Sequence, residues 1–221
     1  MTAFLLAIEG ADGAGKGTAA ANVAAALNDA GRSAVVVSYP RYRDTVGGLV
    51  LGDFLAGKLG RAVTPEAAAV LYALDRLESR AHLADAMAAH DVVVLDRYTA
   101  SNMAYQAAKV PADAAPALMR WILQLEREQF ALPTPDLQVY LDTPLEVSRR
   151  LIAQKHQRSY TDRTYDEHEA DLALQGRVRA NYAAMAAADL GGRWITVAGA
   201  PRAPDAIAAE IVALIGQAPH R

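Results

Sequence analysis

Residues 10–18 carry the pattern whose chemistry is most readily inferred. They read Gly-Ala-Asp-Gly-Ala-Gly-Lys-Gly-Thr, directly after the apolar run 4–8 and directly before the helix-forming stretch 19–30. Glycines let successive backbone N–H groups turn toward one anion, the helix N-terminus adds partial positive charge, and Lys16 can reach the outer phosphates of a nucleotide. The segment therefore predicts a nucleoside triphosphate site; the alternative is a glycine-rich turn within an α/β core.

The glycine loop departs from the common pattern at one position. Gly10, Gly15 and Lys16 fit G-x-x-x-x-G-K, but the next residue, normally serine or threonine, is Gly17. The hydroxyl comes one residue later, at Thr18. The placement between a strand and a helix, more than the bare spacing, favours the phosphate-binding interpretation.

An acidic and a basic residue follow the apolar run 92–95. Ligands of open parallel sheets bind beyond the carboxyl ends of the strands, so we expect Asp96 and Arg97 beside the glycine loop. A carboxylate there can hold Mg²⁺, directly or through water, and an arginine can neutralise phosphate charge. The alternative is a strand-end ion pair on the surface.

Polar and aromatic residues follow this pair on a predicted helix. Ser101 comes first, and at ~100° per residue Asn102, Tyr105 and Gln106 then share one face close to the same strand end. Such a face beside a phosphate site is typical of a surface that recognises a base and a sugar, although a solvated helix face has the same composition.

One long helix is predicted from Thr64 to near His90. A stripe on one side is expected to be core: Val70, Leu74, Leu77, Ala81 and Ala84. The opposite side carries Tyr72 and Arg76 one turn apart, and then Leu83 and Met87. Two apolar faces predict that the helix packs on the sheet and also meets a second subunit. Tyr72 and Arg76 either serve a ligand or form a solvated pair near Asp75.

Two further segments carry aromatic or basic groups. Tyr39, Pro40, Arg41 and Tyr42 follow the second predicted strand, where the proline fixes a turn. A basic cluster precedes the acidic run 166–169 and comprises Arg149, Arg150, Lys155, His156, Arg158 and Arg163. Basic clusters are usually solvated helix faces, but a mobile loop that closes on polyphosphate needs this composition, because phosphoryl transfer relies on charge neutralisation away from water.

The elements that must position these residues alternate between strands and helices. Strands are predicted at 4–8, 34–39, 92–95, 137–141 and 194–197. Four of these five are nearly continuous apolar runs, as expected of strands buried on both faces. The fold class predicted is α/β, a five-stranded parallel sheet wrapped by helices, in a single domain over residues 1–221 with a lid at about 149–166. Residues 41–60 and 154–166 are the least regular.

Composition limits the classes of function. The chain has 221 residues and a net charge of −3, so we expect no nucleic-acid partner. It has no cysteine, so we expect no disulfide and no thiolate chemistry. The histidines form no zinc pattern, and no apolar run has membrane length. The sequence opens directly on a strand without a basic leader. We expect a soluble, cytoplasmic protein.

Taken together, the motifs resemble the thymidylate (dTMP) kinase family of P-loop nucleoside monophosphate kinases, in its actinobacterial type, over nearly the whole chain. The resemblance rests on residues 9–16, on Tyr-Pro-Arg-Tyr at 39–42, on Leu-Asp-Arg at 74–76, and on Asp-Arg-Tyr at 96–98 with Ser101, Asn102, Tyr105 and Gln106. It implies Mg²⁺-dependent transfer of the ATP γ-phosphoryl group to dTMP, giving dTDP and ADP, by a homodimer.

The resemblance also implies roles for individual residues. The catalytic residues would be Asp12, Lys16, Asp96 and Arg97. ATP would be bound by Gly10, Ala11, Asp12, Gly13, Ala14, Gly15, Lys16, Gly17, Thr18 and the lid arginines Arg158 and Arg163. The dTMP-binding residues would be Asp12, Tyr39, Arg41, Tyr42, Tyr72, Arg76, Arg97, Ser101, Asn102, Tyr105 and Gln106. Arg76 and Asn102 would bond the thymine edge, Arg41 and Arg97 the phosphate, and Tyr105 would crowd the 2′ position. Metal ligands would be Asp12, Asp96, Asp166 and Glu169.

Three positions depart from the family pattern. Gly17 lacks the hydroxyl that usually binds Mg²⁺, so the ion would depend more on water, phosphate oxygens and carboxylates. Gly13 stands where some members have arginine, and His168 where tyrosine is common.

Two other functions compete with this one. A deoxynucleoside kinase would need a base beside a free 5′-hydroxyl, and Arg41 and the thymine-edge residues argue against it. A P-loop ATPase or GTPase switch usually follows its second acidic strand with D-x-x-G or carries N-K-x-D, whereas Asp96 here leads into Arg-Tyr-Thr-Ala-Ser-Asn.

Overall fold

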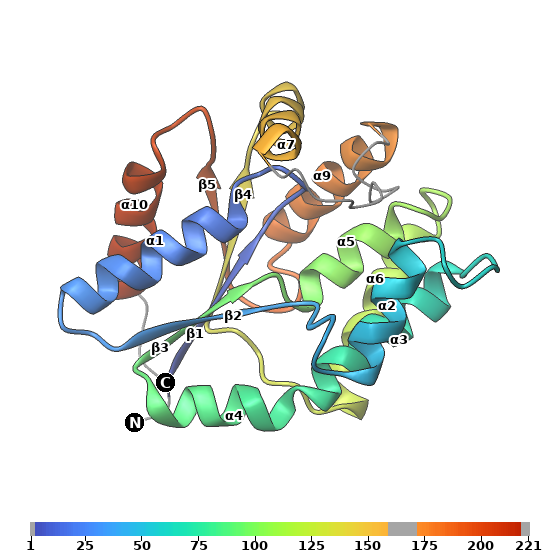
Figure 1. Ribbon diagram of the computed structural model, residues 1–221, viewed down its shortest axis with the longest axis horizontal. Helices are drawn as coiled ribbons and strands as arrows, with labels where there is room; N and C mark the ends of the chain where they lie inside the picture. Colours follow the sequence, from blue (N-terminus) through green and yellow to red (C-terminus); the bar gives the residue numbers. More distant parts are fainter. Residues whose placement is uncertain (1–2, 159–171, 218–221) are drawn as a thin grey trace.

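A single parallel sheet forms the centre of the molecule. The computed structural model describes residues 3–153 and 172–217 in full and the backbone of residues 154–158. In these ranges the sheet has five strands in the order β2-β3-β1-β4-β5 (Figure 1). The strands are β1 (Phe4–Glu9), β2 (Ala34–Ser38), β3 (Val92–Asp96), β4 (Leu137–Asp142) and β5 (Trp194–Ala198). The five predicted strands and the predicted fold class are confirmed.

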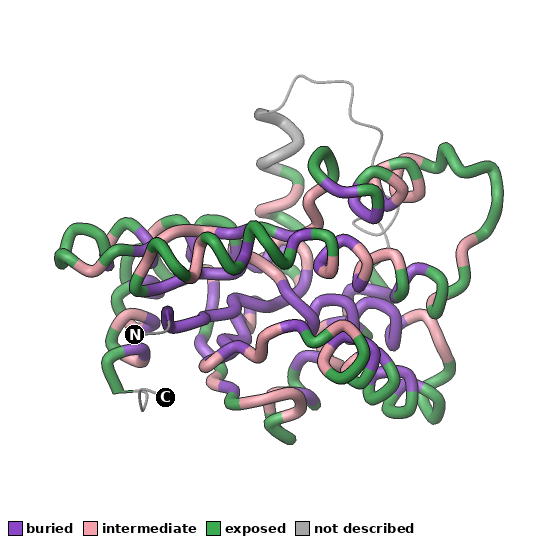
Figure 2. The backbone as a smooth tube through the Cα atoms, turned by 90° about the horizontal axis from the view of Figure 1, so that it is seen from below, coloured by how far each residue is buried: buried purple, intermediate pink, exposed green. Residues whose placement is uncertain are grey.

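Helices cover both faces of the sheet, which is why its strands are so apolar. On one face α1 (Lys16–Asp29) and α10 (Pro204–Gly216) pack against Leu6, Ile8 and Val94. The other face is covered by α4 (Arg80–Ala89), α5 (Thr99–Ala107) and α9 (Leu172–Ala187). The strands are accordingly buried, while the outer sides of the helices are exposed (Figure 2).

The helix predicted from Thr64 to near His90 is two helices, so the prediction of one is wrong. The first, α3 (Pro65–Glu78), begins after Thr64, whose side chain accepts a hydrogen bond from Ala67 N. It ends at Ser79, and α4 starts at the next residue. The Ser79 hydroxyl donates to the Asp75 carbonyl over 2.7 Å, a side-chain bond that competes with the helical ladder at the break.

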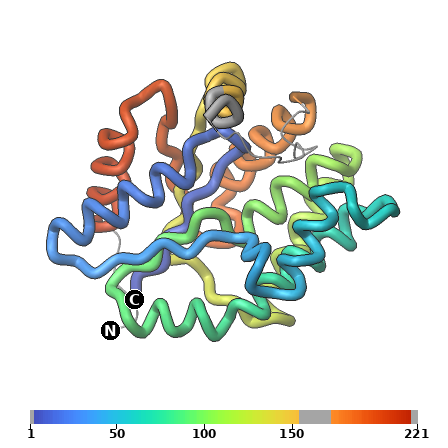
Figure 3. The backbone as a smooth tube through the Cα atoms, in the orientation of Figure 1, coloured from blue at the N-terminus to red at the C-terminus, as the bar shows by residue number. Residues whose placement is uncertain are grey.

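The predicted core stripe of this segment is also wrong. Val70, Ala81 and Ala84 are exposed, whereas Ala69 and Arg76 are buried. The reason is that α3 packs against α2 (Val46–Leu55) and α5. Its small residues therefore face helices, and its arginine pairs with Glu126. Figure 3 shows α2 and α3 beside α5 and α6 (Ala115–Gln124).

The prediction that residues 41–60 are irregular is wrong over α2. Gly47 lies within α2 and allows this helix to pack closely against α3. A Cβ atom on Gly47 would lie 2.6 Å from the Asp75 backbone nitrogen. The helix is capped by Thr45, whose side chain accepts from Gly48 N over 2.8 Å.

Two further elements complete the frame of the site. Helix α6 is followed directly by the π-helical turn η1 (Leu125–Gln129), and β4 is followed by α7 (Leu145–Arg158). The basic segment expected to be a lid is therefore helical at its start, and its remainder lies outside the described residues. Among the helices of the described ranges, none is long and apolar enough to cross a membrane.

Candidate active site

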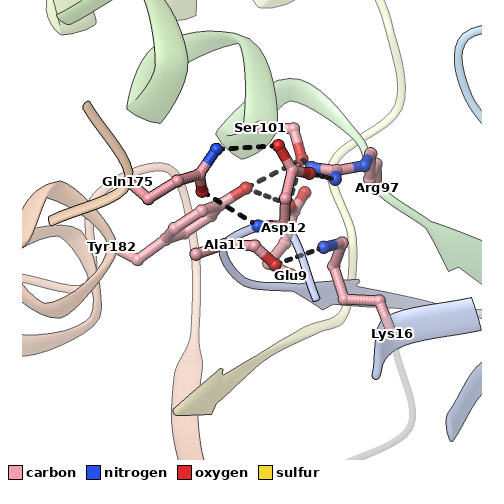
Figure 4. Close-up of polar contacts among 8 residues, drawn as sticks. All are labelled: Glu9, Ala11, Asp12, Lys16, Arg97, Ser101, Gln175 and Tyr182. Carbon is pink, nitrogen blue, oxygen red and sulfur yellow. Dashed lines mark hydrogen bonds and ion pairs between the residues drawn. The ribbon is translucent and has the colours of Figure 1, made fainter. Parts of the chain in front are cut away.

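The glycine loop joins the carboxyl end of β1 to α1. Gly15 caps α1 with a φ of +94°, a conformation that glycine adopts without strain. Lys16 is the first residue of α1, and its Nζ donates to the Ala11 carbonyl over 2.7 Å (Figure 4). Burial and the positive charge of Arg97 lower the pKa of Lys16 to about 8. A buried cation at a helix N-terminus is the arrangement that a polyphosphate needs.

Arg97 lies against the same loop, as the sequence predicts. It follows β3 in the left-handed backbone region at φ +67°, and its amide donates to Ile8 O over 3.2 Å. Its guanidinium donates to Asp12 in the loop and lies 5.3 Å above the centre of the Tyr105 ring. The alternative of a surface ion pair between Asp96 and Arg97 is wrong, because Arg97 pairs with Asp12 and the side chains of Arg97 and Asp12 are only 23% and 11% exposed.

Asp12 is held as an anion. Its Oδ2 accepts from Gln175 Nε2 over 2.9 Å, and its backbone N–H donates to Gln175 Oε1 over 3.2 Å. Burial opposes the charge, but Arg97 and Lys16 outweigh it and lower the pKa of Asp12 to about 2. Gln175 comes from α9, so its role could not be inferred from the loop sequence.

Glu9 supports this arrangement through three hydrogen bonds; the sequence analysis quoted it in the motif 9–16 but gave it no role. It ends β1, is fully buried, and accepts from Tyr98 N over 2.7 Å, Ser101 Oγ over 2.6 Å and Tyr182 OH over 3.0 Å. Burial raises the pKa of Glu9. Its position at a strand end directly before the glycine loop was the available signal.

A cavity opens beside Asp12 and Arg97. The cavity gathers nearly all residues predicted to bind the acceptor nucleotide: Asp12, Tyr39, Tyr42, Tyr72, Arg76, Arg97, Ser101, Asn102 and Tyr105. Three lining residues were not predicted, namely Pro40, Leu55 and Tyr98. Leu55 is the last residue of α2, in the segment that was predicted to be irregular. Tyr98 was quoted only as part of a motif.

Arg41 and Gln106 do not line this cavity. The Arg41 guanidinium pairs with the exposed carboxylate of Asp44 at 3.2 Å. The Gln106 side chain is buried, and its Oε1 accepts from Lys109 Nζ over 3.2 Å.

Arg76 is buried at the cavity wall. Its side chain is 2% exposed, so the solvated pair considered for Tyr72 and Arg76 is wrong. Arg76 Nε donates to Glu126 Oε2 over 2.7 Å, and a second guanidinium nitrogen also donates to that carboxylate. Burial lowers the pKa of Arg76, but the ion pair with Glu126 outweighs burial and the net shift is upward. Asn102 Nδ2 donates to Glu126 as well, over 2.9 Å. Glu126 was missed in the sequence.

A second, larger cavity lies on the other part of the loop. It is lined by Ala14, Gly15 and Thr18 from the predicted ATP-binding set, by Arg150 and Leu151 of α7, and by Pro201 and Arg202 before α10. Only the backbone of Arg158 is described, and Arg163 lies outside the described residues. The glycine loop thus forms part of the wall of both cavities.

Two of the four predicted metal ligands are described. Asp12 and Asp96 both raise the pKa of Lys16 through their charge, so both carboxylates lie near its amine. A Cβ atom on Gly17 would lie 3.1 Å from Asp96 Oδ2, so this carboxylate faces the position of the missing hydroxyl. Oxygen donors of this kind fit Mg²⁺. Within the described ranges no group of three or more potential metal-binding side chains occurs, and Asp166 and Glu169 lie outside them.

Comparisons with known proteins agree on one family. The model of the family described as Thymidylate kinase matches residues 8–211. The thymidylate kinase of Mycobacterium tuberculosis (strain H37Rv) is 39% identical over 209 residues, which cover 94% of this chain and 97% of that protein. The thymidylate kinase of Thermomicrobium roseum is 34% identical over 224 residues, covering 99% and 97%. The solved thymidylate kinase of Candida albicans, at 22% identity, has the same fold, with a TM-score of 0.72 over 98% of this chain and 92% of that one.

Proposed function

Because the chain belongs to the thymidylate kinase family, we propose that it transfers the γ-phosphoryl group of ATP to the phosphate of dTMP, giving dTDP and ADP. The observation that best supports this reaction is that two cavities share one glycine loop, with Lys16 and Arg97 beside it. Two nucleotides bound there could approach in line, which makes the encounter intramolecular and requires no covalent enzyme intermediate.

The smaller cavity is the proposed dTMP site. Tyr39 and Tyr72 would lie along the base, and Arg76 and Asn102 would bond its edge. Tyr105 would crowd the sugar, and Ser101 and Tyr42 complete the wall. Arg41 would join the acceptor phosphate by leaving Asp44, an exchange of low cost because that carboxylate is largely exposed.

The larger cavity is the proposed donor site. The loop from Gly10 to Thr18 would bind the ATP phosphates through backbone N–H groups, with Lys16 on the outer phosphates. Arg150 and Arg202 line the space left for the nucleoside. Arg158 and Arg163, in or after α7, are the proposed lid arginines.

Catalysis would rest on charges fixed before the substrates arrive. Arg97 is held by Asp12 beside the glycine loop, so it would need little reorganisation to bind the acceptor phosphate and the group in transfer. Lys16 neutralises the donor side. Asp12 and Asp96, with Asp166 and Glu169, would hold Mg²⁺, which when bound neutralises charge on the phosphate oxygens.

We also propose a homodimer, working in the cytoplasm. Three large apolar side chains are exposed on adjoining helices: Val46 and Leu49 on α2 and Val70 on α3, at 61%, 55% and 40%. Such a face is usually covered by a partner. A second copy would thus pack on the outer side of the helices that form the dTMP site.

A phosphotransfer assay with ATP and a panel of acceptors tests the function. We expect dTDP from dTMP, with lower efficiency for dCMP, dGMP and dAMP. Phosphorylation of thymidine in preference to dTMP would favour the deoxynucleoside kinase. ATP hydrolysis unaffected by any monophosphate would favour the switch. Lys16→Met is the control for contaminating kinases, since it removes the phosphate-binding amine.

A further inference from the structure

Glu126 is a buried carboxylate that touches both residues proposed to read the base. It has no exposed surface and lies in the π-helical turn η1. Its Oε2 accepts from Arg76 Nε and Thr99 Oγ1, each over 2.7 Å. Its Oε1 accepts from Asn102 Nδ2 over 2.9 Å and from Arg76 Nη2. A carboxylate has about four lone-pair sites, so these four donors saturate it.

These contacts fix the orientation of the Asn102 amide. Its Nδ2 donates to the Ala69 carbonyl over 3.0 Å and to Glu126. Both partners are acceptors only, so the amide nitrogen must face them. The Asn102 oxygen, Oδ1, is buried without a hydrogen-bond partner among the described residues, and Asn102 lines the cavity. Asn102, at the wall of the cavity, thus carries an unused acceptor.

Arg76 supplies the complementary group. A guanidinium has five N–H donors and no acceptor, and two of its nitrogens are held by Glu126. Arg76 can therefore present only donors to the cavity. Its polarity is intrinsic, whereas an asparagine amide can be reversed by a flip. The hydrogen-bonding pattern of the pocket therefore depends on the orientation of the Asn102 amide, because Arg76 can only donate.

Resting on the proposed function, we propose that Glu126 is the positioning residue that makes the base pocket select thymine over cytosine. Thymine presents an N3–H donor beside the O4 acceptor, which matches Asn102 Oδ1 beside Arg76. Cytosine presents N3 as an acceptor beside an amino donor, so both of its groups would meet a group of the same kind. Glu126 acts through Asn102 and Arg76, without touching the base.

Glu126→Gln tests this role because it preserves size but replaces one acceptor oxygen by an amide donor. The charge of Arg76 retains the remaining oxygen, so the amide nitrogen falls toward Asn102, and only the Ala69 carbonyl still holds the Asn102 amide in its orientation. We expect the ratio of kcat/KM for dTMP to that for dCMP to fall about tenfold or more, since a mismatched buried hydrogen bond carries a cost of this order. The ratio for dTMP to dUMP should change less than about twofold, because uracil has the same edge.

Two further variants complete the test. Thr99→Val removes one donor to the same carboxylate and leaves Arg76 and Asn102 in place, so both ratios should remain unchanged. Glu126→Asp keeps the charge that Arg76 requires but withdraws the oxygens from Asn102. It should shift the dCMP ratio in the same direction, and it carries the test if Glu126→Gln does not fold.

The outcomes separate this inference from the function on which it rests. An equal loss of efficiency with dTMP, dUMP and dCMP in Glu126→Gln, or in Glu126→Asp if that variant alone folds, would overturn the inference, because it would show only structural damage. A wild-type protein that does not prefer dTMP to dCMP would instead contradict the proposed function.

Discussion

Arg97 at the end of β3 and Asp12 in the glycine loop form an ion pair that joins the two halves of the site. Glu9 lies beneath it and holds the turn that carries Arg97 through the Tyr98 amide and the Ser101 hydroxyl. The geometry of the pair depends on β1, β3, the glycine loop and α9 together. Several measurements follow from this arrangement.

Replacing Arg97 should damage turnover far more than binding of ATP. We expect Arg97→Ala to lower kcat by ~10³-fold or more, by analogy with other arginines that stabilise phosphoryl transfer. Steady-state kinetics with saturating dTMP measures the effect, and Arg97→Lys is the matched variant that retains charge but not the bidentate fork. A loss below about tenfold in Arg97→Ala would remove Arg97 from the catalytic residues.

Restoring the usual hydroxyl at position 17 should be tolerated. Gly17→Ser brings its Cβ 3.1 Å from Asp96 Oδ2, so the carboxylate must move by a few tenths of an ångström. We expect activity to persist, because the proposed carboxylate ligands would supply oxygen donors for Mg²⁺. Titration of both proteins with Mg²⁺ checks this, with Gly17→Ala as the control for the Cβ alone. Activity in Gly17→Ala with none in Gly17→Ser would assign the fault to the hydroxyl.

The pKa of Lys16 predicts a loss of ATP use at alkaline pH. Because this pKa is lowered to about 8 in the free protein, the amine loses its proton above that pH and no longer attracts phosphate. We expect kcat/KM for ATP to fall about tenfold per pH unit above pH 8. Lys16→Arg should be slower but should lack this fall, since arginine keeps its charge. A wild-type profile that stays flat to pH 9.5 would show that Lys16 remains protonated in the free protein.

The contact between α2 and α3 predicts a stability difference between two glycines. Gly47→Ala places a Cβ 2.6 Å from the Asp75 backbone and should lower the free energy of unfolding by about 1–3 kcal/mol. Gly52→Ala, on the same helix, places its Cβ 3.8 Å from the Tyr42 ring and should be neutral or slightly stabilising. Urea denaturation of both variants measures this. Equal stability of the two would contradict the packing described for α2.

The strands and the glycine loop were predictable because their signals are local. Continuous apolar runs report burial on both faces, and the loop spacing reports a backbone that must approach an anion. The polar face of α5 was predictable for the same reason, since helical periodicity places Asn102 and Tyr105 together.

The rest could not be predicted because it depends on contacts between distant residues. The sequence reports that Gly47 has no side chain, but not that α3 lies against it. Glu126 meets Arg76 across 50 positions, and Tyr182 meets Glu9 across 173. No local sequence pattern distinguishes Glu126 from an acidic residue on a solvated helix face, so its buried contact with Arg76 could not be inferred.

We propose that the donor and acceptor phosphates meet at the glycine loop. A bisubstrate inhibitor that links adenosine and thymidine through five phosphates tests it directly by isothermal titration calorimetry. We predict one inhibitor per chain, bound at least ~10²-fold more tightly than ATP or dTMP alone and displaced by either. Binding that persists unchanged when dTMP saturates its own site would show that the two cavities do not converge, and would contradict the account.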